Sequence, residues 1–379
     1  MKKFSIFFLL LVLCAWGVSA QDAVKGEVKD IVPQGSYTPS FKMDGSDKAP
    51  LNVILMIGDG MGIAHLATAM YANGGELTIT NLKTCGWVRT NPAGKFTTDS
   101  AASGTAYATG HKTHVSAIGV DVNDQSLENL PEKLSKEGIV SGIVTTDGLD
   151  GATPAAFFAH QPDRHLSAEI WADLPASKLT FFAAGSAEDF EDQSYETCDA
   201  ISKKFTVVND LSEPRAERAK RLGYLPPKAK TASVNKNRGD FLPATTDYAI
   251  RFLSSRATKG KGFFLMVEGA RIDKSSHDND YPAMVGEVLD FDKAVEAAVR
   301  FAEKDGRTLV LVSADHETGA LSLRDGNPAE GRMKGIFVSR GHTSIPVPIF
   351  AYGPCSQEFM GMQENSDVGN KIARLLSGK

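Results

Sequence analysis

Short, continuous apolar runs alternate along the chain with longer amphipathic stretches. Residues 52–57 form an apolar run of the kind found in strands buried on both faces of a parallel sheet. Apolar residues between Val285 and Ala302 recur with helical spacing. This alternation predicts a doubly wound α/β fold, with a mostly parallel central sheet and helices on both faces. Further strands are predicted at residues 87–90, 139–145, 179–183, 262–267, 308–312 and 348–352.

Two segments lack this pattern. Residues 21–50 are polar and interrupted by Pro and Gly, which predicts an extended leader on the surface. Residues 215–239 are rich in Lys and Arg and show no clear periodicity. We interpret them as part of a variable surface insertion at about 186–240, whose charge is solvated. Residues 51–379 are predicted to form one domain that contains this insertion.

The first twenty residues predict an export signal. Lys2 and Lys3 precede an apolar run at residues 4–16, and Val18-Ser19-Ala20 has the small residues of a cleavage site. The run is shorter than the roughly 20 apolar residues of a membrane span. Cleavage after Ala20 would therefore leave no membrane span, and we expect a periplasmic or secreted protein.

Charge and cysteine content narrow the possible functions. The 379 residues include 41 Lys or Arg and 46 Asp or Glu, for a formal net charge of −5. They contain no basic block, so nothing indicates a nucleic-acid-binding module. Removal of the signal would leave Cys85, Cys198 and Cys355, which allow at most one disulfide whose partners the sequence does not choose.

Other conspicuous side chains are expected to have structural roles. Packing or surface roles are predicted for His111, His114, His160 and His165. Core positions are predicted for Trp87, Trp171 and the Phe pairs at 157–158, 181–182 and 263–264.

A polar stretch at residues 96–104 leads Ser100 into a set of small residues. The pattern places Ser100 near a helix N-terminus, where unpaired backbone N–H groups can bind an anion. Taken alone, Thr98, Asp99 and Ser100 would be interpreted as helix-capping residues. The residues that follow several strands change that interpretation.

Acidic residues and histidines follow several of the predicted strands. Asp59 comes directly after the strand at 52–57, at the edge where open α/β sheets bind ligands. Carboxylates gathered at one edge would repel one another unless cations lay between them. Their mixture of nitrogen and oxygen donors suits Zn²⁺. The candidates are Asp59, Asp273, His277, Asp315, His316 and His342.

Six short motifs that contain these residues occur in the order seen in alkaline phosphatases, and from about residue 52 to the C-terminus the chain resembles that family. Arg164 follows Thr153 at the family's spacing. The resemblance implies an alkaline-phosphatase-like fold and an exported phosphomonoesterase, with residues 51–379 as its catalytic domain. The motifs are GDGMG at 58–62, TDSAAS at 98–103, ATPAA at 152–156, EGARIDKSSH at 268–277, ADH at 314–316 and GHT at 341–343.

The resemblance also implies two zinc ions and a catalytic role for Ser100 and Arg164. Ser100, as an exchangeable zinc ligand, would be activated without a histidine base and would form a phosphoserine that water hydrolyses. Arg164 would bind two phosphate oxygens with its guanidinium fork; outside this context it would be expected to pair with Asp163 or Glu169. The implied ligands are Asp273, His277 and His342 for the first zinc, and Asp59, Asp315 and His316 for the second.

A third implied ion, Mg²⁺, would be held by the oxygen ligands of Asp59, Thr153 and Glu268. Members of the family usually carry Asp or His at the position that is Gly151 here. We therefore expect a weaker or more exchangeable Mg²⁺. Lys274 then lacks an obvious partner and could approach the substrate phosphate.

Two other functions are compatible with the same residues. A phosphodiesterase of the same superfamily could share the metal set, but Ser100 rather than Thr, together with the spacing of Arg164, favours monoesters. A non-catalytic exported protein that binds zinc or phosphate is disfavoured because both residues are intact. Family members are commonly dimers, which allows a homodimer here.

Overall fold

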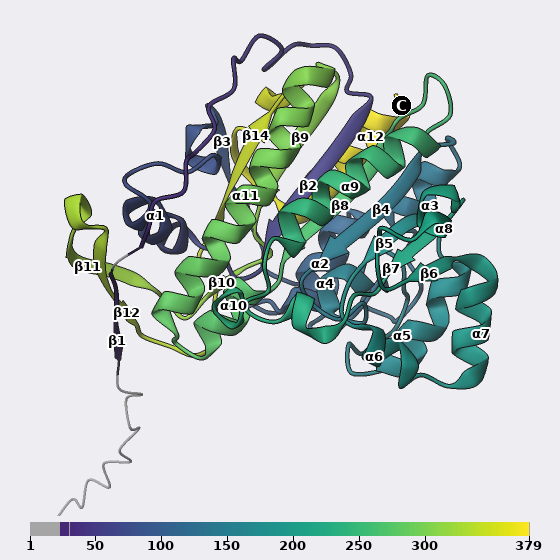
Figure 1. Ribbon diagram of the computed structural model, residues 1–379, viewed down its shortest axis with the longest axis horizontal. Helices are drawn as coiled ribbons and strands as arrows, with labels where there is room; N and C mark the ends of the chain where they lie inside the picture. Colours follow the sequence, from purple (N-terminus) through teal and green to yellow (C-terminus); the bar gives the residue numbers. More distant parts are fainter. Residues whose placement is uncertain (1–22, 30, 379) are drawn as a thin grey trace, which may run out of the picture.

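The centre of the molecule is a ten-stranded sheet (Figure 1). The computed structural model describes residues 23–29 and 31–378, so the predicted export signal lies outside the described residues. Neighbouring strands are parallel except at β14, which runs antiparallel to both of its neighbours. Across the sheet the strands are β15 (Gly361–Glu364), β3 (Thr84–Arg89), β14 (Val347–Tyr352), β9 (Thr308–Ser313), β2 (Asn52–Gly58), β8 (Phe263–Gly269), β4 (Val140–Thr145), β5 (Leu179–Ala183), β7 (Leu222–Tyr224) and β6 (Thr206–Val208).

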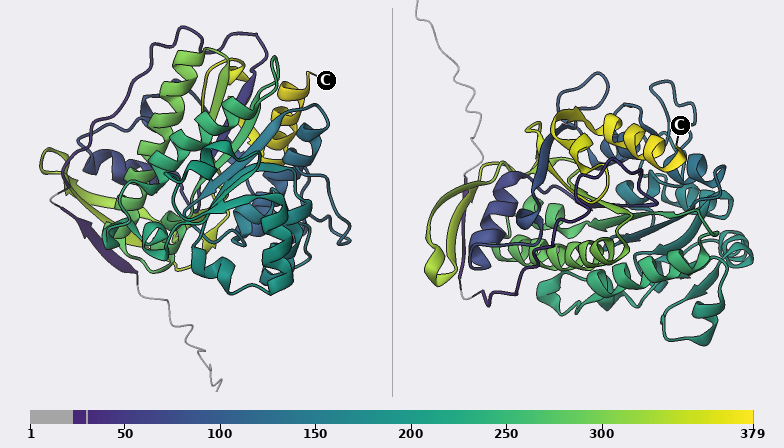
Figure 2. Two further views of the ribbon diagram at one scale, coloured as in Figure 1. Left: turned by 45° about the vertical axis from the view of Figure 1, so that its right-hand side comes forward. Right: turned by 90° about the horizontal axis from the view of Figure 1, so that it is seen from above.

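Helices cover both faces of this sheet, as the view from above in Figure 2 shows. On one face α9 (Phe241–Arg256) and α11 (Tyr281–Asp305) pack against central strands, and on the other α12 (Asn365–Ser377) packs with α2 (Ser100–Thr109). Every residue of β2, β8 and β9 is buried, because helices cover these strands on both sides. The predicted α/β fold is confirmed. The other helices are α1 (Ile63–Ala72), α3 (Leu130–Ser135), α4 (Ala152–Ala155), α5 (Ser167–Asp173), α6 (Ala187–Glu191), α7 (Tyr195–Lys204), α8 (Pro214–Arg218) and α10 (Arg271–His277).

The strands predicted from the apolar runs correspond to strands of the central sheet, but the sequence did not reveal all of its members. β6 and β7 have three residues each, too few for a recognisable pattern. Both lie within the segment interpreted as an insertion, and they extend one end of the central sheet. Part of this segment is therefore built into the core rather than laid on the surface.

The leader is also more ordered than expected. β1 (Val24–Val28) pairs with β12 (Arg332–Phe337), which in turn pairs with β11 (Ser322–Asn327). Gly26 and Gly335 lie opposite each other, and a Cβ at either position would come within 2.4 Å of the Tyr281 side chain. The two glycines thus let this small sheet pack closely on the start of α11.

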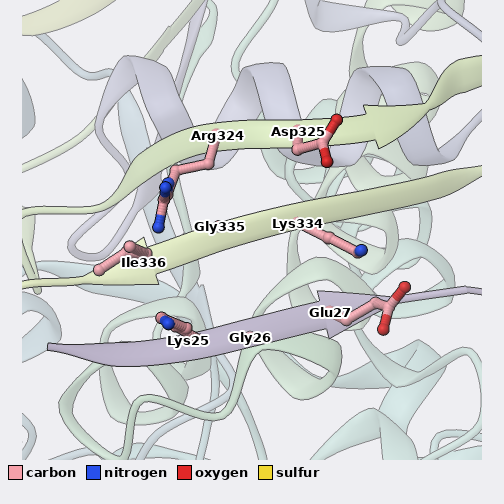
Figure 3. A pocket seen from close by; sticks show the side chains of 8 residues that line it. All are labelled: Lys25, Gly26, Glu27, Arg324, Asp325, Lys334, Gly335 and Ile336. Atoms are coloured by element: carbon pink, nitrogen blue, oxygen red, sulfur yellow. The ribbon is translucent and has the colours of Figure 1, made fainter.

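The opposite face of the small sheet is hollowed (Figure 3). The side chains that line the hollow include both positive and negative charges, and none of them was a candidate metal ligand in the sequence. The hollow is separate from the predicted catalytic residues. It is lined by Lys25, Gly26, Glu27, Arg324, Asp325, Lys334, Gly335 and Ile336.

The aromatic predictions hold with one exception. Trp171 and the three Phe pairs are buried. Trp87 is 41% exposed, so its assignment to the core was wrong. β3 alternates buried and exposed residues, and Trp87 lies on its open face.

No disulfide joins cysteines in the described part of the chain: Cys85 is exposed, Cys198 is half-buried and Cys355 is buried, all as free thiols. Among the described helices, none is both long and apolar enough to cross a membrane.

Arg238 contradicts the expectation that the charges of the insertion are only solvated. Its side chain is 1% exposed and its Nη2 lies 2.6 Å from carboxylate oxygens of both Glu287 and Asp290 on α11. Burial raises the pKa of Asp290 to about 6 even though Arg238 acts in the opposite direction. The insertion is thus attached to the core by a buried ion pair.

Removing Arg238 should destabilise the fold, because it leaves two carboxylates buried without their cation. We expect Arg238→Ala to lower the free energy of unfolding near neutral pH by about 3 kcal/mol, measured by denaturant titration. Arg215→Ala, which removes an exposed pair with Glu213 in the same segment, should cost less than about 0.5 kcal/mol. Equal effects of the two variants would contradict the structural role of Arg238.

Candidate active site

Four neighbouring parallel strands, β9, β2, β8 and β4, end at one edge of the sheet and carry many of the candidate residues. Asp59 directly follows β2, and Asp315 and His316 follow β9. Glu268 is the penultimate residue of β8 and lies opposite Thr145 in the register with β4. The carboxyl ends of parallel strands meet at the same edge, so residues distant in sequence become neighbours.

Asp59, Asp315 and His316 form a buried group whose ligand atoms all lie within 4.8 Å of one another. His316 Nε2 is 3.2 Å from Asp315 Oδ2 and 3.5 Å from Asp59 Oδ1. The buried oxygens Asp59 Oδ1 and Asp315 Oδ2 have no hydrogen-bond partner among the described residues. A buried acceptor without a donor is costly. This set of nitrogen and oxygen atoms therefore fits a zinc ion.

A second group of the same tightness contains Asp273, His316 and His342. His277, four residues after Asp273 on α10, turns Nε2 to within 3.2 Å of Asp273 Oδ2 and 3.1 Å of His342 Nε2. The rings of His316 and His342 are stacked with centroids 3.6 Å apart, so the two groups adjoin. The structure thus brings together the residues implied for the first zinc, with His316 between the two groups.

A two-stranded ladder, β10 (Glu317–Thr318) with β13 (His342–Thr343), carries His342 to this place. The Thr318 hydroxyl donates a hydrogen bond to Asp273 Oδ1 and lies 3.2 Å from His316 Nδ1. It therefore contacts a residue from each implied zinc site. Sequence reasoning missed Thr318 because a hydroxyl near a ligand has no distinctive local pattern.

Ser100 is the first residue of α2, as its sequence context predicted. Asp99 caps the helix by accepting a hydrogen bond from Ala102 N at 3.0 Å. Ser100 Oγ is 3.2 Å from His316 Nε2, and Ser103 Oγ donates to the carbonyl of Asp315 at 2.7 Å. The cap and the candidate nucleophile are therefore adjacent residues on a helix tied to the loop after β9.

Arg164 is held near Ser100 by an ion pair with Asp99, which the sequence did not suggest. Its Nη1 is 3.4 Å from Asp99 Oδ2, the oxygen that also accepts a hydrogen bond from Ser116 N. The suggested pairs with Asp163 and Glu169 do not form, and Asp163 instead binds His165 at 2.7 Å. Asp99 thus has a second role besides capping, because it holds the guanidinium beside the helix N-terminus.

Of the residues implied for the third ion, Asp59 follows β2, Glu268 lies near the end of β8 and Thr153 lies on α4. The Thr145 hydroxyl donates to Glu268 Oε2. The buried Thr153 hydroxyl has no hydrogen bond of normal geometry to any described residue, although it lies close enough to Glu268 to favour that residue's ionised form. These oxygens, with those of Asp59, fit a hard cation such as Mg²⁺.

Lys274 does have a partner, so the expectation that it lacks one was wrong. Its Nζ donates to Asp147 Oδ1, and the two side chains are 44% and 27% exposed. Asp147 comes two residues after β4. The rule that located Asp59, an acidic residue at the end of a predicted strand, would have found it.

Burial and mutual repulsion perturb the acidic residues strongly. Burial, followed by the charges of Asp315 and Asp273, raises the pKa of Asp59 well above its usual value. Burial and the charge of Asp147 raise the pKa of Glu268 to about 8. A bound cation would favour ionisation of both groups.

The first implied zinc site behaves differently because histidines surround its carboxylate. Burial acts against the ionised form of Asp273, but the hydrogen bond from His277 and the nearby histidines hold its pKa well below the usual range. The same hydrogen bond raises the pKa of His277 to about 8. Burial and the proximity of His316 lower the pKa of His342 to about 4.

The other histidines are engaged elsewhere. His114 binds Asp124, and His160 lies between Glu132 and the carbonyl of Gly119. In the described ranges, neither belongs to a group that could hold a metal ion. These findings agree with the structural roles expected for them.

A family model described as alkaline phosphatase matches residues 51–195 and 222–336. The chain belongs to the alkaline phosphatase family. It is therefore a hydrolase of the phosphomonoesterase type, in a family that depends on metal ions. The unmatched residues 196–221 fall within the segment interpreted as an insertion.

Individual members of the alkaline phosphatase family match most of the chain. It is 30% identical to the alkaline phosphatase of Escherichia coli, over 88% of each chain. It is 31% identical to streptomycin-6-phosphate phosphatase of Streptomyces griseus, over 89% of this chain and 93% of that one.

A solved structure, the alkaline phosphatase of the Antarctic bacterium TAB5, shares 35% identity with a TM-score of 0.81 and covers 87% of this chain and 98% of that one. A variant of the TAB5 enzyme with a histidine replaced by glutamate, at 34% identity and the same TM-score and coverage, is described with Mg bound in its M3 site.

The raised pKa values predict how pH affects the metal-free alkaline phosphatase. Burial raises the pKa of Glu268 from 4.5 to about 8, and the hydrogen bond with Asp273 raises the pKa of His277 from 6.5 to about 8. Between about pH 6.5 and 8 the folded chain therefore binds more protons than the unfolded chain, so its stability falls as pH rises. Thermal unfolding of chelator-treated protein should show this decrease.

The Glu268→Gln variant provides the control for this pH effect. It should show a weaker decrease, because one of the two titrating groups is gone. Wild-type protein reloaded with Zn²⁺ and Mg²⁺ should also lose much of it, because the cations keep Glu268 ionised. A stability that is constant or rises over the same range in chelator-treated wild type would contradict the prediction.

Proposed function

We propose that the chain hydrolyses phosphate monoesters in two steps through a phosphoserine at Ser100, with two Zn²⁺ and one Mg²⁺ as cofactors. The observation that carries this proposal is the position of Ser100 Oγ, 3.2 Å from His316 Nε2 at the edge of a buried group that fits a metal ion. The zinc residues would be Asp273, His277 and His342, and Asp59, Asp315 and His316. The Mg²⁺ residues would be Asp59, Thr153 and Glu268.

Three buried oxygens support binding of cations at this place. Asp59 Oδ1, Asp315 Oδ2 and Thr153 Oγ1 are buried and make no hydrogen bond of normal geometry to the described residues, although His316 Nε2 lies 3.5 Å and 3.2 Å from the first two. When bound beside Ser100, Zn²⁺ would lower the pKa of the hydroxyl and balance the charge of the phosphate oxygens. The histidine beside Ser100, His316, belongs to the proposed zinc residues, so the metal would take the place of a histidine base.

The protein's own groups would position the phosphate. Arg164, held by Asp99, presents a guanidinium fork that can bind two nonbridging oxygens. Backbone N–H groups at the start of α2 add positive potential on the same side. Lys274, paired with Asp147, is left as a weaker candidate for phosphate contact.

The two steps follow from this placement. Ser100 Oγ forms a bond to phosphorus as the bond to the departing alcohol oxygen breaks, and the alcohol takes up a proton. Water then attacks the phosphoserine, and inorganic phosphate leaves as Ser100 regains its proton. Arg164 would bind phosphate oxygens in both steps.

Replacement of Ser100 tests this role. Ser100→Ala should lower kcat/KM for an aryl phosphate by about 10³-fold or more, because the nucleophile is lost, while the metal content by mass spectrometry stays unchanged. Thr97→Ala removes an exposed hydroxyl in the same loop and should have little effect. Turnover of Ser100→Ala within a few-fold of wild type would refute the proposal.

The same assay with a bis-aryl phosphate serves as a substrate control. Arg164 and two cation sites suit the higher charge of a monoester, so the diester should be the poorer substrate. A diester hydrolysed faster than the monoester would favour phosphodiesterase activity.

Export to the periplasm or medium is part of the proposal, and the support for it is the basic and apolar pattern of residues 1–20. The mature protein should begin at Gln21, because cleavage is expected after Ala20. N-terminal sequencing of the fractionated protein checks this, and a cytoplasmic protein that retains Met1 would contradict it. The resemblance to the family also allows a homodimer, which light scattering would test.

A further inference from the structure

Gly151 is required by its surroundings rather than by its backbone conformation. Its φ of −54° is accessible to any L-residue. A Cβ at this position would, however, lie 2.8 Å from Asp147 Oδ2 and 2.9 Å from the carbonyl oxygen of Gly148. The carboxylate of Asp147 therefore occupies the space that a side chain at position 151 would need.

Asp147 is held in that space from several sides. Its backbone N donates a hydrogen bond to Thr145 Oγ1 at 2.9 Å, and the same hydroxyl donates to Glu268. Its Oδ1 accepts a hydrogen bond from Lys274. Oδ2 is the oxygen on the side of Gly151. Thr145 thus links the backbone of Asp147 to the carboxylate proposed for the third ion.

Asp147 adds a carboxylate next to the Glu268 group. The Thr145 hydroxyl that donates to Glu268 also accepts the hydrogen bond from the backbone N of Asp147. Lys274 is 44% exposed and binds one oxygen of Asp147, so it offsets this charge only in part. Thr153 Oγ1, in a side chain buried to 99%, lies beside Glu268 but makes no hydrogen bond of normal geometry to the residues described. Excess negative charge and a buried hydroxyl without a hydrogen bond of normal geometry both point to a cation.

We propose that Asp147 is a positioning residue of the Mg²⁺ site, and that its carboxylate strengthens the retention of the ion and orients Lys274. This inference rests on the proposed function, since it assumes that Asp59, Thr153 and Glu268 hold Mg²⁺. Asp147 reaches the site from the end of β4, through the space that Gly151 leaves open. The absence of an acidic side chain at Gly151 predicted that Mg²⁺ would be exchangeable. Asp147 supplies an acidic group to the Mg²⁺ site in place of one at position 151.

The test is the affinity of the full-length, zinc-loaded protein for Mg²⁺, measured by isothermal titration calorimetry. Asp147→Asn keeps the shape of the side chain and removes its charge. It should weaken Mg²⁺ binding by about tenfold or more, as expected for the loss of a group that supports metal ligands. Zinc content by mass spectrometry should not change. Wild-type affinity in Asp147→Asn would overturn the inference.

Asp150→Asn is the matched control, because Asp150 lies in the same loop but binds Ser167. It makes the same change of charge and should leave Mg²⁺ affinity within about twofold of wild type. An equal loss in both variants would overturn the inference in favour of a general charge effect. Gly151→Ala provides a second approach: its methyl group would displace Asp147 without changing any charge, and it should also weaken Mg²⁺ binding.

The same titrations separate this inference from the proposed function. If the wild type, Asp147→Asn and Gly151→Ala all bind Mg²⁺ with the same affinity, the third ion is supported but the role of Asp147 is contradicted. A wild-type protein that binds no Mg²⁺ contradicts the third ion itself, and with it this inference. If Asp147→Asn does not fold, Gly151→Ala still decides, since unchanged affinity in that variant overturns the inference.

Discussion

The repulsion among buried carboxylates at one edge of the sheet is the constraint on which the active site depends. Asp59, Asp315 and Glu268 come from three adjacent strands or the loops that follow them, and burial removes the water that would screen them. Asp59 and Glu268 accordingly have raised pKa values. A fold that gathers such groups is stable in their ionised form only with positive charge between them, so folding and metal binding are coupled.

The scaffold around this charge holds the ligands in place through hydrogen bonds from neighbouring side chains. α2 is tied to the loop after β9 through Ser103, and Asn365 of α12 donates to the same Ser103 hydroxyl at 2.9 Å. Thr318 contacts both Asp273 and His316. Groups of this kind determine the orientation of ligands, and their loss commonly weakens metal binding.

The predictions that failed have a common cause. For Arg164, the only ion pairs that local sequence offered were with Asp163 and Glu169, which applied outside the family context, and neither forms. Arg164 instead lies beside Asp99, 65 positions away. Lys274 was expected to have no partner, but it meets Asp147 from another strand, 127 positions away. The positions of Trp87 and Arg238 were predicted from residue type alone. Trp87, expected in the core, is exposed, and Arg238, expected at the surface, is buried. Composition and local spacing contain no information about such contacts.

The apolar runs by themselves determined the class of fold, seven strands of the central sheet and the residues that end several of them, because burial on both faces leaves a continuous apolar pattern. The ordered motifs identified the family and nominated the metal and catalytic residues. Only the tertiary structure decided which of these groups touch. It placed His316 between two groups, joined Asp99 to Arg164 and brought Asp147 into the space beside Gly151. The physical reason is that parallel strands bring distant segments together at one edge, where the contacts depend on register and packing rather than on neighbouring letters.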